Sequence, residues 1–277
     1  MEALEKQSYD SSLYRVYVVD NGSTEDIEKI TQAFPFVCYL LEQKPGSYNA
    51  RNKAIASLQS EDFVGFTDSD CIPDQDWIKN AVSCLKHEIN SAIGGKVSVF
   101  TRQEQPSTLE AYEQLFAFPQ QHYIESANFA VTANLFVTRA MLDKVGAFNT
   151  ELLSGGDADF GQRLHQHGFN LEYRSNVVVK HPARDTIRQI ITKIKRTVGG
   201  GYTQRHRNDA AGKLFTWRSL VRGFVPPVTA FLKIASEKRF PTQLKVQLCL
   251  LAWYFKYYTN GLRCLYKLRV YSSYERC

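Results

Sequence analysis

The sequence predicts an α/β protein with a doubly wound, mainly parallel sheet, helices on both faces, and a C-terminal helical appendage. Strand and helix patterns alternate through the first 180 of the 277 residues, which is the order of a parallel sheet with crossover helices. Aspartate clusters follow two of the strands, at the edge where such sheets bind ligands. After residues 199–201 the chain becomes apolar, aromatic and basic. We therefore expect a main domain over residues 1–204 and a helical tail over residues 205–277.

The individual elements follow from the spacing of apolar residues. Strands are expected at residues 14–19, 36–41, 63–67, 92–100 and 177–179, where β-branched and aromatic side chains are frequent. Helices are expected at residues 24–33, 48–58 and 77–85, and another helix follows Gly155 and Gly156. In the tail, Pro226, Pro227 and Pro241 divide the apolar stretch into several helices.

Charge is distributed unevenly along the chain. Residues 1–179 hold 14 Lys and Arg against 24 Asp and Glu, a balance of −10, whereas residues 180–277 hold 20 against 4, a balance of +16. A basic tail on an acidic body predicts an anionic partner, such as a phospholipid surface, a diphosphate or nucleic acid. The aromatic and aliphatic content of the tail suits helix packing or lipid contact better, so we expect no nucleic-acid partner.

Cysteine usage and hydropathy indicate where the protein works. The six cysteines lie far apart without a Cys-x-x-Cys pair, which argues against a zinc site or a disulfide framework and favours a reducing compartment. The most membrane-like stretch, Val246–Tyr258, is interrupted by Lys256 and falls short of the ~20 apolar residues that span a bilayer. We expect a cytoplasmic protein whose tail contacts the inner face of the cell membrane peripherally.

A candidate metal site is the sequence Asp68-Ser69-Asp70, which directly follows the apolar run of residues 63–67. Two carboxylates two residues apart at a strand end provide hard oxygen ligands. Such ligands suit Mg²⁺ or Mn²⁺ and leave positions open for substrate phosphates. Aspartates also end strands simply because they form turns, and the tripeptide alone arises often by chance.

Three further features give this carboxylate pair a chemical context. Gly46 precedes a helix with Arg51 in its first turns, and a helix start with a guanidinium can hold a diphosphate. The alternative to a diphosphate contact is that Arg51 is only a solvated residue on the helix surface. Asp157 follows Gly156 at another helix start, where a carboxylate caps the helix whether or not it catalyses anything. His181 ends a strand, a place where a lone histidine is more often structural than a ligand.

The order of these motifs resembles that of family 2 glycosyltransferases. Between about Leu13 and His181 the chain reads Val-Val-Asp-Asn-Gly-Ser-Thr, Gly-Ser-Tyr-Asn-Ala-Arg-Asn, Asp-Ser-Asp, Thr-Ala-Asn-Leu, Gly-Gly-Asp-Ala-Asp-Phe-Gly-Gln-Arg-Leu and Val-Lys-His. Six motifs in order are far more specific than any one of them. The resemblance implies a GT-A fold, a nucleoside-diphosphate sugar donor, a divalent metal (Mg²⁺ or Mn²⁺), and transfer of the sugar to an acceptor hydroxyl with inversion.

The resemblance also implies roles for the residues that meet the donor. Asp20 reads the nucleotide base, with Asn21 beside it. Arg51 contacts the diphosphate, and Asp68 touches the ribose or the metal. Residues 132–134, Thr-Ala-Asn, lie where the family lines the sugar pocket, without an assigned role.

Metal binding and catalysis fall to three further residues by the same resemblance. Asp70 is a metal ligand, and His181 completes the metal or diphosphate site. Asp157 matches the catalytic base, with Asp159 as the alternative. The usual Glu-Asp pair of the family is Gly156-Asp157 here, which leaves the orientation of the acceptor open. We expect the metal ligands and the base to converge on one crevice although they lie far apart in the sequence.

The expected partners are a nucleoside-diphosphate sugar donor and a saccharide or lipid-linked acceptor, in the synthesis of a cell-surface polysaccharide or glycoconjugate. Other interpretations stay open. A catalytically impaired relative or a membrane-associated binding protein has the same motifs and tail. A sugar nucleotidyltransferase shares the doubly wound sheet but needs a Gly-rich, Arg-containing loop after the first strand, which this sequence lacks.

The chain is expected to begin later than the family pattern does. Family 2 enzymes open with an apolar strand and a helix, and residues 1–10 resemble only the end of that helix. The family's first strand lies inside the sheet, between the strand ending at Asp20 and the strand ending at Asp68. We expect a longer natural protein in preference to a remnant with impaired folding.

Overall fold

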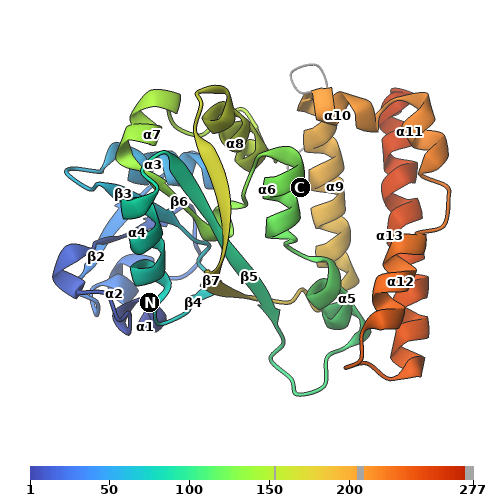
Figure 1. Ribbon diagram of the computed structural model, residues 1–277, viewed down its shortest axis with the longest axis horizontal. Helices are drawn as coiled ribbons and strands as arrows, with labels where there is room; N and C mark the ends of the chain where they lie inside the picture. Colours follow the sequence, from blue (N-terminus) through green and yellow to red (C-terminus); the bar gives the residue numbers. More distant parts are fainter. Residues whose placement is uncertain (153, 205–208, 272–277) are drawn as a thin grey trace. The chain divides into compact units, whose positions relative to one another are not determined.

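The computed structural model describes residues 1–152, 154–204 and 209–271, which form two compact units (Figure 1). Unit 1 comprises Met1–Ser98, Phe118–Leu152 and Gly156–His181, and unit 2 comprises Val99–Ala117, Leu153–Gly155 and Pro182–Cys277. The division differs from the expected boundary after residue 204. Two helices that precede this boundary, α5 (Thr108–Phe116) and α9 (Ile187–Gln204), pack against the long tail helix α13 (Thr242–Lys267) and so belong to unit 2.

The strands form two sheets. They are β1 (Val16–Asp20), β2 (Val37–Leu41), β3 (Phe63–Phe66), β4 (Ile72–Pro73), β5 (Ser91–Phe100), β6 (Leu135–Thr138) and β7 (Asn170–Pro182). β1 and β2 make a two-stranded sheet, and the other strands make a sheet of order β3-β6-β5-β7-β4. Helices lie between most successive strands along the chain, so the alternation expected from the sequence is confirmed.

Strand direction differs from the expected mainly parallel sheet. β1 and β2 are parallel, and β5 and β7 also run in the same direction. The Asn170 N–H at the start of β7 bonds to the carbonyl of Asn90, just before β5, and the Ala183 N–H just after β7 bonds to the carbonyl of Phe100 at the end of β5. β6 pairs antiparallel with both β3 and β5, and β4 pairs antiparallel with β7. Alternation predicts that β3, β5 and β7 point one way. It does not predict that β6, entered through the short helix η2 (Thr132–Asn134), inserts between β3 and β5 in the opposite direction.

The β1–β2 sheet is separate from the five-stranded sheet, in which β3 is an edge strand. Helix α3 (Ser47–Ala56) packs against β1, and the segment after this helix holds the strand through side chains. Tyr17 donates its hydroxyl to the carboxylate of Glu61 at 2.8 Å and to the Ser57 carbonyl at 3.3 Å. The division between the sheets therefore falls between the strand that ends at Asp20 and the strand that precedes Asp68.

Helices cover both faces of the five-stranded sheet, as predicted. The other helices of unit 1 are α1 (Glu2–Glu5), η1 (Ser11–Leu13), α2 (Ile27–Thr31), α4 (Trp77–His87), α6 (Gln120–Ala127), α7 (Arg139–Val145) and α8 (Gly156–Gln166). Successive side chains of β6 point to opposite faces. Leu135 and Val137 join the core beneath α7 and α8, whereas Phe136 joins the core beneath α4.

Unit 2 is helical, in agreement with the expected tail. Besides α5, α9 and α13 it contains α10 (Asp209–Leu214), α11 (Trp217–Arg222) and α12 (Val228–Ser236). α9 and α13 run side by side (Figure 1), and α13 also packs against α5, α11 and α12. The buried Glu113 of α5 pairs with Arg184 at 2.5 Å and with Lys193 of α9 at 3.7 Å. Among the described residues, no helix has both the length and the hydropathy needed to span a bilayer.

A buried amide connects the elements around η2. The Asn134 side chain donates to the Lys96 carbonyl of β5 at 2.9 Å and to the Val177 carbonyl of β7 at 3.0 Å. It accepts from the Trp77 indole of α4 at 2.9 Å. Gln120 of α6 donates to the backbone carbonyl of Asn134 at 3.0 Å. Asn134 is fully buried, so each of these groups depends on it for a hydrogen bond that water does not supply.

We predict that Asn134→Ala lowers the free energy of unfolding by about 3 kcal/mol or more. The substitution leaves two carbonyls and an indole N–H buried without this partner, and each such group costs ~1–3 kcal/mol. Urea unfolding followed by circular dichroism measures the change. Asn80→Ala is the matched control, because Asn80 makes its bond to the Asn176 carbonyl at the surface, and its loss should cost less than ~1 kcal/mol. Equal losses for the two variants would contradict the prediction.

Candidate active site

An ion pair joins α3 to the carboxyl end of β3. Arg51 of α3 donates to the Asp68 carboxylate at 2.6 Å. The Arg51 side chain is 16% exposed and that of Asp68 is 36% exposed, so the pair is partly screened from water. The guanidinium also lies 5.8 Å from the ring centre of Tyr48, one turn earlier on the same helix. Two residues predicted to meet the donor are therefore in direct contact, and their side chains are held in place.

Asn21 fixes the loop that leads into α3. Its side-chain N–H groups donate to the carbonyls of Glu42 at 2.7 Å and Lys44 at 2.8 Å, and its side-chain oxygen accepts from the Gly46 N–H at 2.7 Å. Gly46 has φ of 126°, a conformation that favours glycine, directly before the helix. The amide expected beside the nucleotide base is thus engaged with the loop, and it sets where the helix that carries Arg51 begins.

Asp20 ends β1 as a half-buried residue. It accepts from the Ser23 N–H at 2.8 Å and from the Tyr39 hydroxyl at 3.4 Å. The bond from the Ser23 N–H is the main cause that lowers the pKa of Asp20, so the group is ionised at neutral pH. These bonds lie within the β1–β2 region and do not connect Asp20 to the Arg51–Asp68 pair. Its role in base recognition stays a prediction.

Asp157 lies in the first turn of α8, where η2 holds its carboxylate. The hydroxyl of Thr132 donates to one oxygen at 3.1 Å, and the Thr132 N–H donates to the other at 3.4 Å. Burial raises the pKa of Asp157 above the ordinary 3.8, the charge of Arg51 and the Thr132 N–H oppose the increase, and the Asp68 carboxylate adds to it. The charges of α3 and β3 therefore reach this carboxylate, and Asp157, Arg51 and Asp68 form one electrostatic group.

Tyr48 is a site residue whose role could not be predicted from the sequence. Its hydroxyl accepts from the Gly156 N–H at 2.8 Å, and burial, followed by the charge of Asp157, raises the pKa of Tyr48 to about 12. A Cβ on Gly156 would lie 2.5 Å from the ring carbon that bears this hydroxyl. The glycine at the position of the expected Glu is thus required by the ring of Tyr48. The motif Gly-Ser-Tyr marked the residue, but no local pattern shows that it reaches α8.

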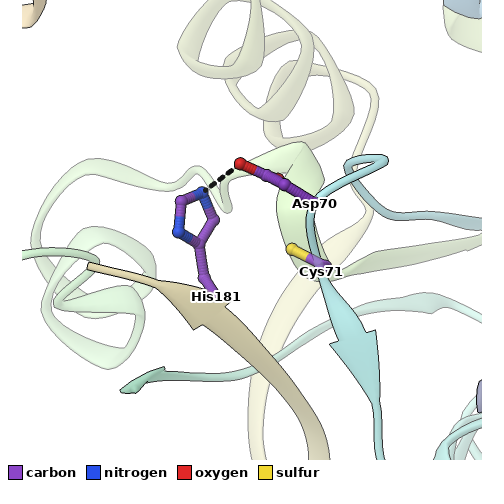
Figure 2. A group of neighbouring side chains, drawn as sticks. All are labelled: Asp70, Cys71 and His181. Carbon is purple, nitrogen blue, oxygen red and sulfur yellow. Dashed lines mark ion pairs between the residues drawn. The ribbon is translucent and has the colours of Figure 1, made fainter. Parts of the chain in front are cut away.

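A second cluster lies where β4 begins and β7 ends. Figure 2 shows the imidazole of His181 and the carboxylate of Asp70 pointing toward each other, with the Cys71 thiol beside them. His181 Nε2 is 3.6 Å from the Asp70 carboxylate, and one ligand atom from each of the three residues lies within 4.8 Å of the others. The His181 side chain is 7% exposed and that of Asp70 is 55% exposed. The ring of Phe118 covers the imidazole at a centroid distance of 4.5 Å.

The donor atoms of this cluster fit a divalent metal. A carboxylate oxygen and an imidazole nitrogen are donors that Mn²⁺ accepts, and the exposed carboxylate leaves space for waters and phosphate oxygens. Burial raises the pKa of Cys71 to about 11, so the thiol is protonated at neutral pH and is a poor ligand. Of the three residues, Asp70 and His181 are therefore the ones suited to hold an ion, and their role as metal ligands stays a prediction. Cys71 was not anticipated.

The two groups are adjacent. The Cys71 N–H bonds to the Asp68 carbonyl at 3.0 Å, so one tight turn carries both the partner of Arg51 and the partner of His181. Asp159, the alternative base, instead pairs with Arg163 at 3.0 Å. Arg163 in turn bonds to carbonyls that follow α7, including that of Ala147 at 2.9 Å. The contacts therefore distinguish Asp157, which the charges of Arg51 and Asp68 reach, from Asp159, which is paired with Arg163.

Several known proteins are similar to this chain in sequence or in fold. Residues 1–146, more than half of the chain, match the profile of Glycosyl transferase family 2. Glycosyltransferase AglE of Haloferax volcanii is 31% identical over 97% of this chain and 91% of that protein. O-antigen chain rhamnosyltransferase WbaN of Salmonella anatum is 26% identical over 68% of this chain and 62% of that protein.

Among solved structures, the mannosyltransferase PcManGT from Pyrobaculum calidifontis, in complex with GDP-Man and Mn²⁺, superposes with a TM-score of 0.61. The alignment covers 98% of this chain and 82% of that chain at 16% identity. At this identity the likeness shows the fold alone. The expected GT-A fold is confirmed by it.

We predict that Gly156→Ala lowers the free energy of unfolding by about 1–3 kcal/mol, the usual cost of overpacking a core. The new methyl group meets the Tyr48 ring, which is buried and stacked on Phe148, so the ring cannot move aside freely. Differential scanning calorimetry measures the loss. Gly201→Ala is the control, because a Cβ there would meet its nearest heavy atom at 4.0 Å and should stabilise helix α9 slightly. Wild-type stability of the Gly156 variant would refute the proposed packing constraint.

Proposed function

We propose, because this chain belongs to glycosyl transferase family 2, that it transfers a sugar from a nucleoside-diphosphate sugar to an acceptor hydroxyl with inversion, and that it depends on a divalent metal. The position of Asp157 carries this proposal. A carboxylate whose pKa is raised by burial lies within electrostatic reach of the Arg51–Asp68 pair. A general base and a cation for a leaving diphosphate are the two groups that such a transfer needs.

Asp157 is the proposed base. It accepts the proton of the acceptor hydroxyl while the acceptor oxygen forms a bond to the sugar C1. The bond between C1 and the diphosphate oxygen breaks on the opposite face, which inverts the configuration at C1. The two hydrogen bonds from Thr132 orient the carboxylate. A pKa above the ordinary aspartate value brings the base closer to the working pH, which improves proton transfer.

Arg51 and Asp20 are the proposed donor contacts. Arg51 faces the diphosphate and stabilises the charge that develops as it leaves. Asp68 orients the guanidinium through the 2.6 Å ion pair and is also the proposed contact to the ribose or the metal. Asp20, at the end of β1, accepts hydrogen bonds from the nucleotide base, and Asn21 contributes by shaping the loop before α3.

Asp70 and His181 are the proposed metal ligands, for Mg²⁺ or Mn²⁺. Their geometry and donor atoms support this assignment, as does the Mn²⁺ in the PcManGT structure, which has a similar fold. When bound, a divalent ion supplies positive charge to the departing diphosphate. The tight turn from Asp68 to Cys71 carries both Asp70 and the partner of Arg51.

The proposed acceptor is a saccharide or lipid-linked saccharide in cell-surface polysaccharide or glycoconjugate synthesis. The O-antigen chain named for the relative WbaN supports an acceptor of this class. The positive balance of the last 98 residues supports a cytoplasmic protein held peripherally at the inner face of the membrane.

We predict that Asp157→Asn lowers the rate of transfer at least 10²-fold, the contribution typical of a general base, while donor binding is retained. A screen of nucleoside-diphosphate sugars for thermal stabilisation with Mn²⁺ identifies the donor, and release of the nucleoside diphosphate then measures transfer. Asp159→Asn is the control, since Asp159 pairs with Arg163, and it should keep most of the activity. The base assignment is wrong if the Asp157 variant is active and the Asp159 variant is not.

The pH profile of wild-type transfer tests the same assignment. The base must be deprotonated, so kcat/KM should fall as the pH decreases through its pKa. Because burial raises the pKa of Asp157 above 3.8, the acid limb should lie above the usual aspartate range. An acid limb at or below that range would contradict a buried aspartate as the base.

We predict that His181→Ala and Asp70→Ala each weaken Mn²⁺ binding at least tenfold, in keeping with the sensitivity of metal sites to their ligands. Thermal shift with Mn²⁺ alone measures binding without reference to activity. Cys71→Ser is the control from the same cluster, because a thiol contributes little to a hard ion. Retained Mn²⁺ binding in both ligand variants would show that the ion lies elsewhere. Loss of Mn²⁺ binding in the Cys71 variant would contradict the assignment of Asp70 and His181 without the thiol.

A further inference from the structure

Exposed apolar side chains are concentrated on the last helices of unit 2. Val221 and Phe224, at the end of α11 and just after it, are each more than half exposed, and so is Leu232 of α12. On α13, Val246 and Leu250 are also more than half exposed. Single exposed apolar residues are normal, but a contiguous set marks an interaction surface. We call these five residues the apolar face.

Contacts at both ends show that the two halves of the apolar face lie side by side. At one end the ring of Phe224 is 6.0 Å from that of Tyr257, whose hydroxyl donates to the Phe224 carbonyl at 2.9 Å. Trp253 packs on the same tyrosine at 5.7 Å, on the helical stripe that continues to Leu250. At the other end Lys245 donates to the Ala235 carbonyl at 2.9 Å. α12 and α13 therefore present one continuous face, rimmed by aromatic rings.

A basic hollow borders the apolar face. Lys213, Arg218 and Arg222 line it together with the hydroxyl residues Thr216 and Ser219, and its volume is about 450 Å³. These cations take part in none of the ion pairs that the structure describes in unit 2. The hollow adjoins the apolar face along α11, since the last residues of that helix contribute to both.

We propose, on the basis of the proposed transfer to a lipid-linked acceptor, that the apolar face and the basic hollow bind the surface of a bilayer containing anionic phospholipids. The apolar side chains enter the boundary between headgroups and acyl chains, where the aromatic ring of Trp253 also suits the interface. The cations of the hollow meet the phosphates.

The positive charge of the basic hollow favours an anionic bilayer over a second copy of the chain as the partner of this surface. Three cations without a described acidic partner complement an anionic surface. A second copy of the chain that met this face through the same surface would bring the same cations against them, and like charges repel. The tail as a whole has the same sign, with 20 Lys and Arg against 4 Asp and Glu over residues 180–277.

Cosedimentation of the full chain with vesicles tests the proposal. The vesicles contain phosphatidylcholine alone or phosphatidylcholine mixed with phosphatidylglycerol. The wild-type chain should pellet with the mixed vesicles, and its binding should weaken as salt is added. Arg218→Glu with Arg222→Glu, and separately Val221→Asp with Leu232→Asp and Leu250→Asp, should each weaken binding about tenfold or more.

Matched controls come from unit 1. Ile89→Asp changes an apolar residue that is 74% exposed, and Lys86→Glu reverses an exposed charge, so both should bind vesicles as the wild type does. Thermal stabilisation by the nucleotide sugar should persist in every variant, which shows that unit 1 is folded. If the chain binds vesicles but no nucleotide sugar stabilises it against heat, the proposed function is rejected, whereas the proposed lipid-binding surface is still supported.

Three results would overturn the lipid surface. The first is a wild-type chain that stays in the supernatant with both kinds of vesicle, and the second is surface variants that bind as well as the wild type. The third is a dimer in sedimentation velocity that the Val221, Leu232 and Leu250 changes dissociate, which would assign the apolar face to a second copy. If the wild-type chain binds vesicles of phosphatidylcholine alone as well as it binds the mixed vesicles, the basic hollow does not contribute to binding.

Discussion

The side-chain amide of Asn134 is the interaction on which the arrangement of the site depends. Its bonds to β5, β7 and α4 fix η2 between the two faces of the sheet. Thr132, two residues earlier in η2, then places its hydroxyl and N–H against Asp157. A residue with no described contact to Asp157 thus helps to determine where the carboxylate of this proposed base points. A buried polar group whose hydrogen bonds are satisfied tolerates few alternative positions. The hydrogen bonds from Thr132 therefore hold the carboxylate of Asp157 in one orientation.

The elements of the fold could be predicted from the sequence, but the topology of the sheet could not be fully predicted. Periodic apolar residues and turn formers are local signals, and they marked the strands before Asp20 and Asp68 and the helices after them. The antiparallel insertion of β6 depends on how the chain returns through η2, which no local pattern records. The two compact units also differ from the boundary expected at residue 204, since α5 and α9 join unit 2 through packing against α13 rather than through composition.

The candidate site shows the same limit at the level of side chains. Motif order located the charged residues, and the structure brings Arg51 to Asp68 and Asp70 to His181. The properties of Asp157 arise from desolvation and from charges on other elements, so they depend on packing that the sequence does not display. Asn21 was linked to the nucleotide by its place in a motif, whereas its atoms are engaged with the loop before α3.

The contact between Tyr48 and Gly156 has a consequence for how this site can evolve. A side chain at position 156 needs the space of the tyrosine ring, and a smaller residue at position 48 removes the acceptor of the Gly156 N–H. The fitness effect of a change at either position therefore depends on the residue at the other, which is epistasis with a steric origin. A lineage that acquired the tyrosine first could no longer regain an acidic side chain at position 156 by a single step. The pair of residues would then be retained while other positions of the chain change. Orientation of the acceptor would have to come from another residue.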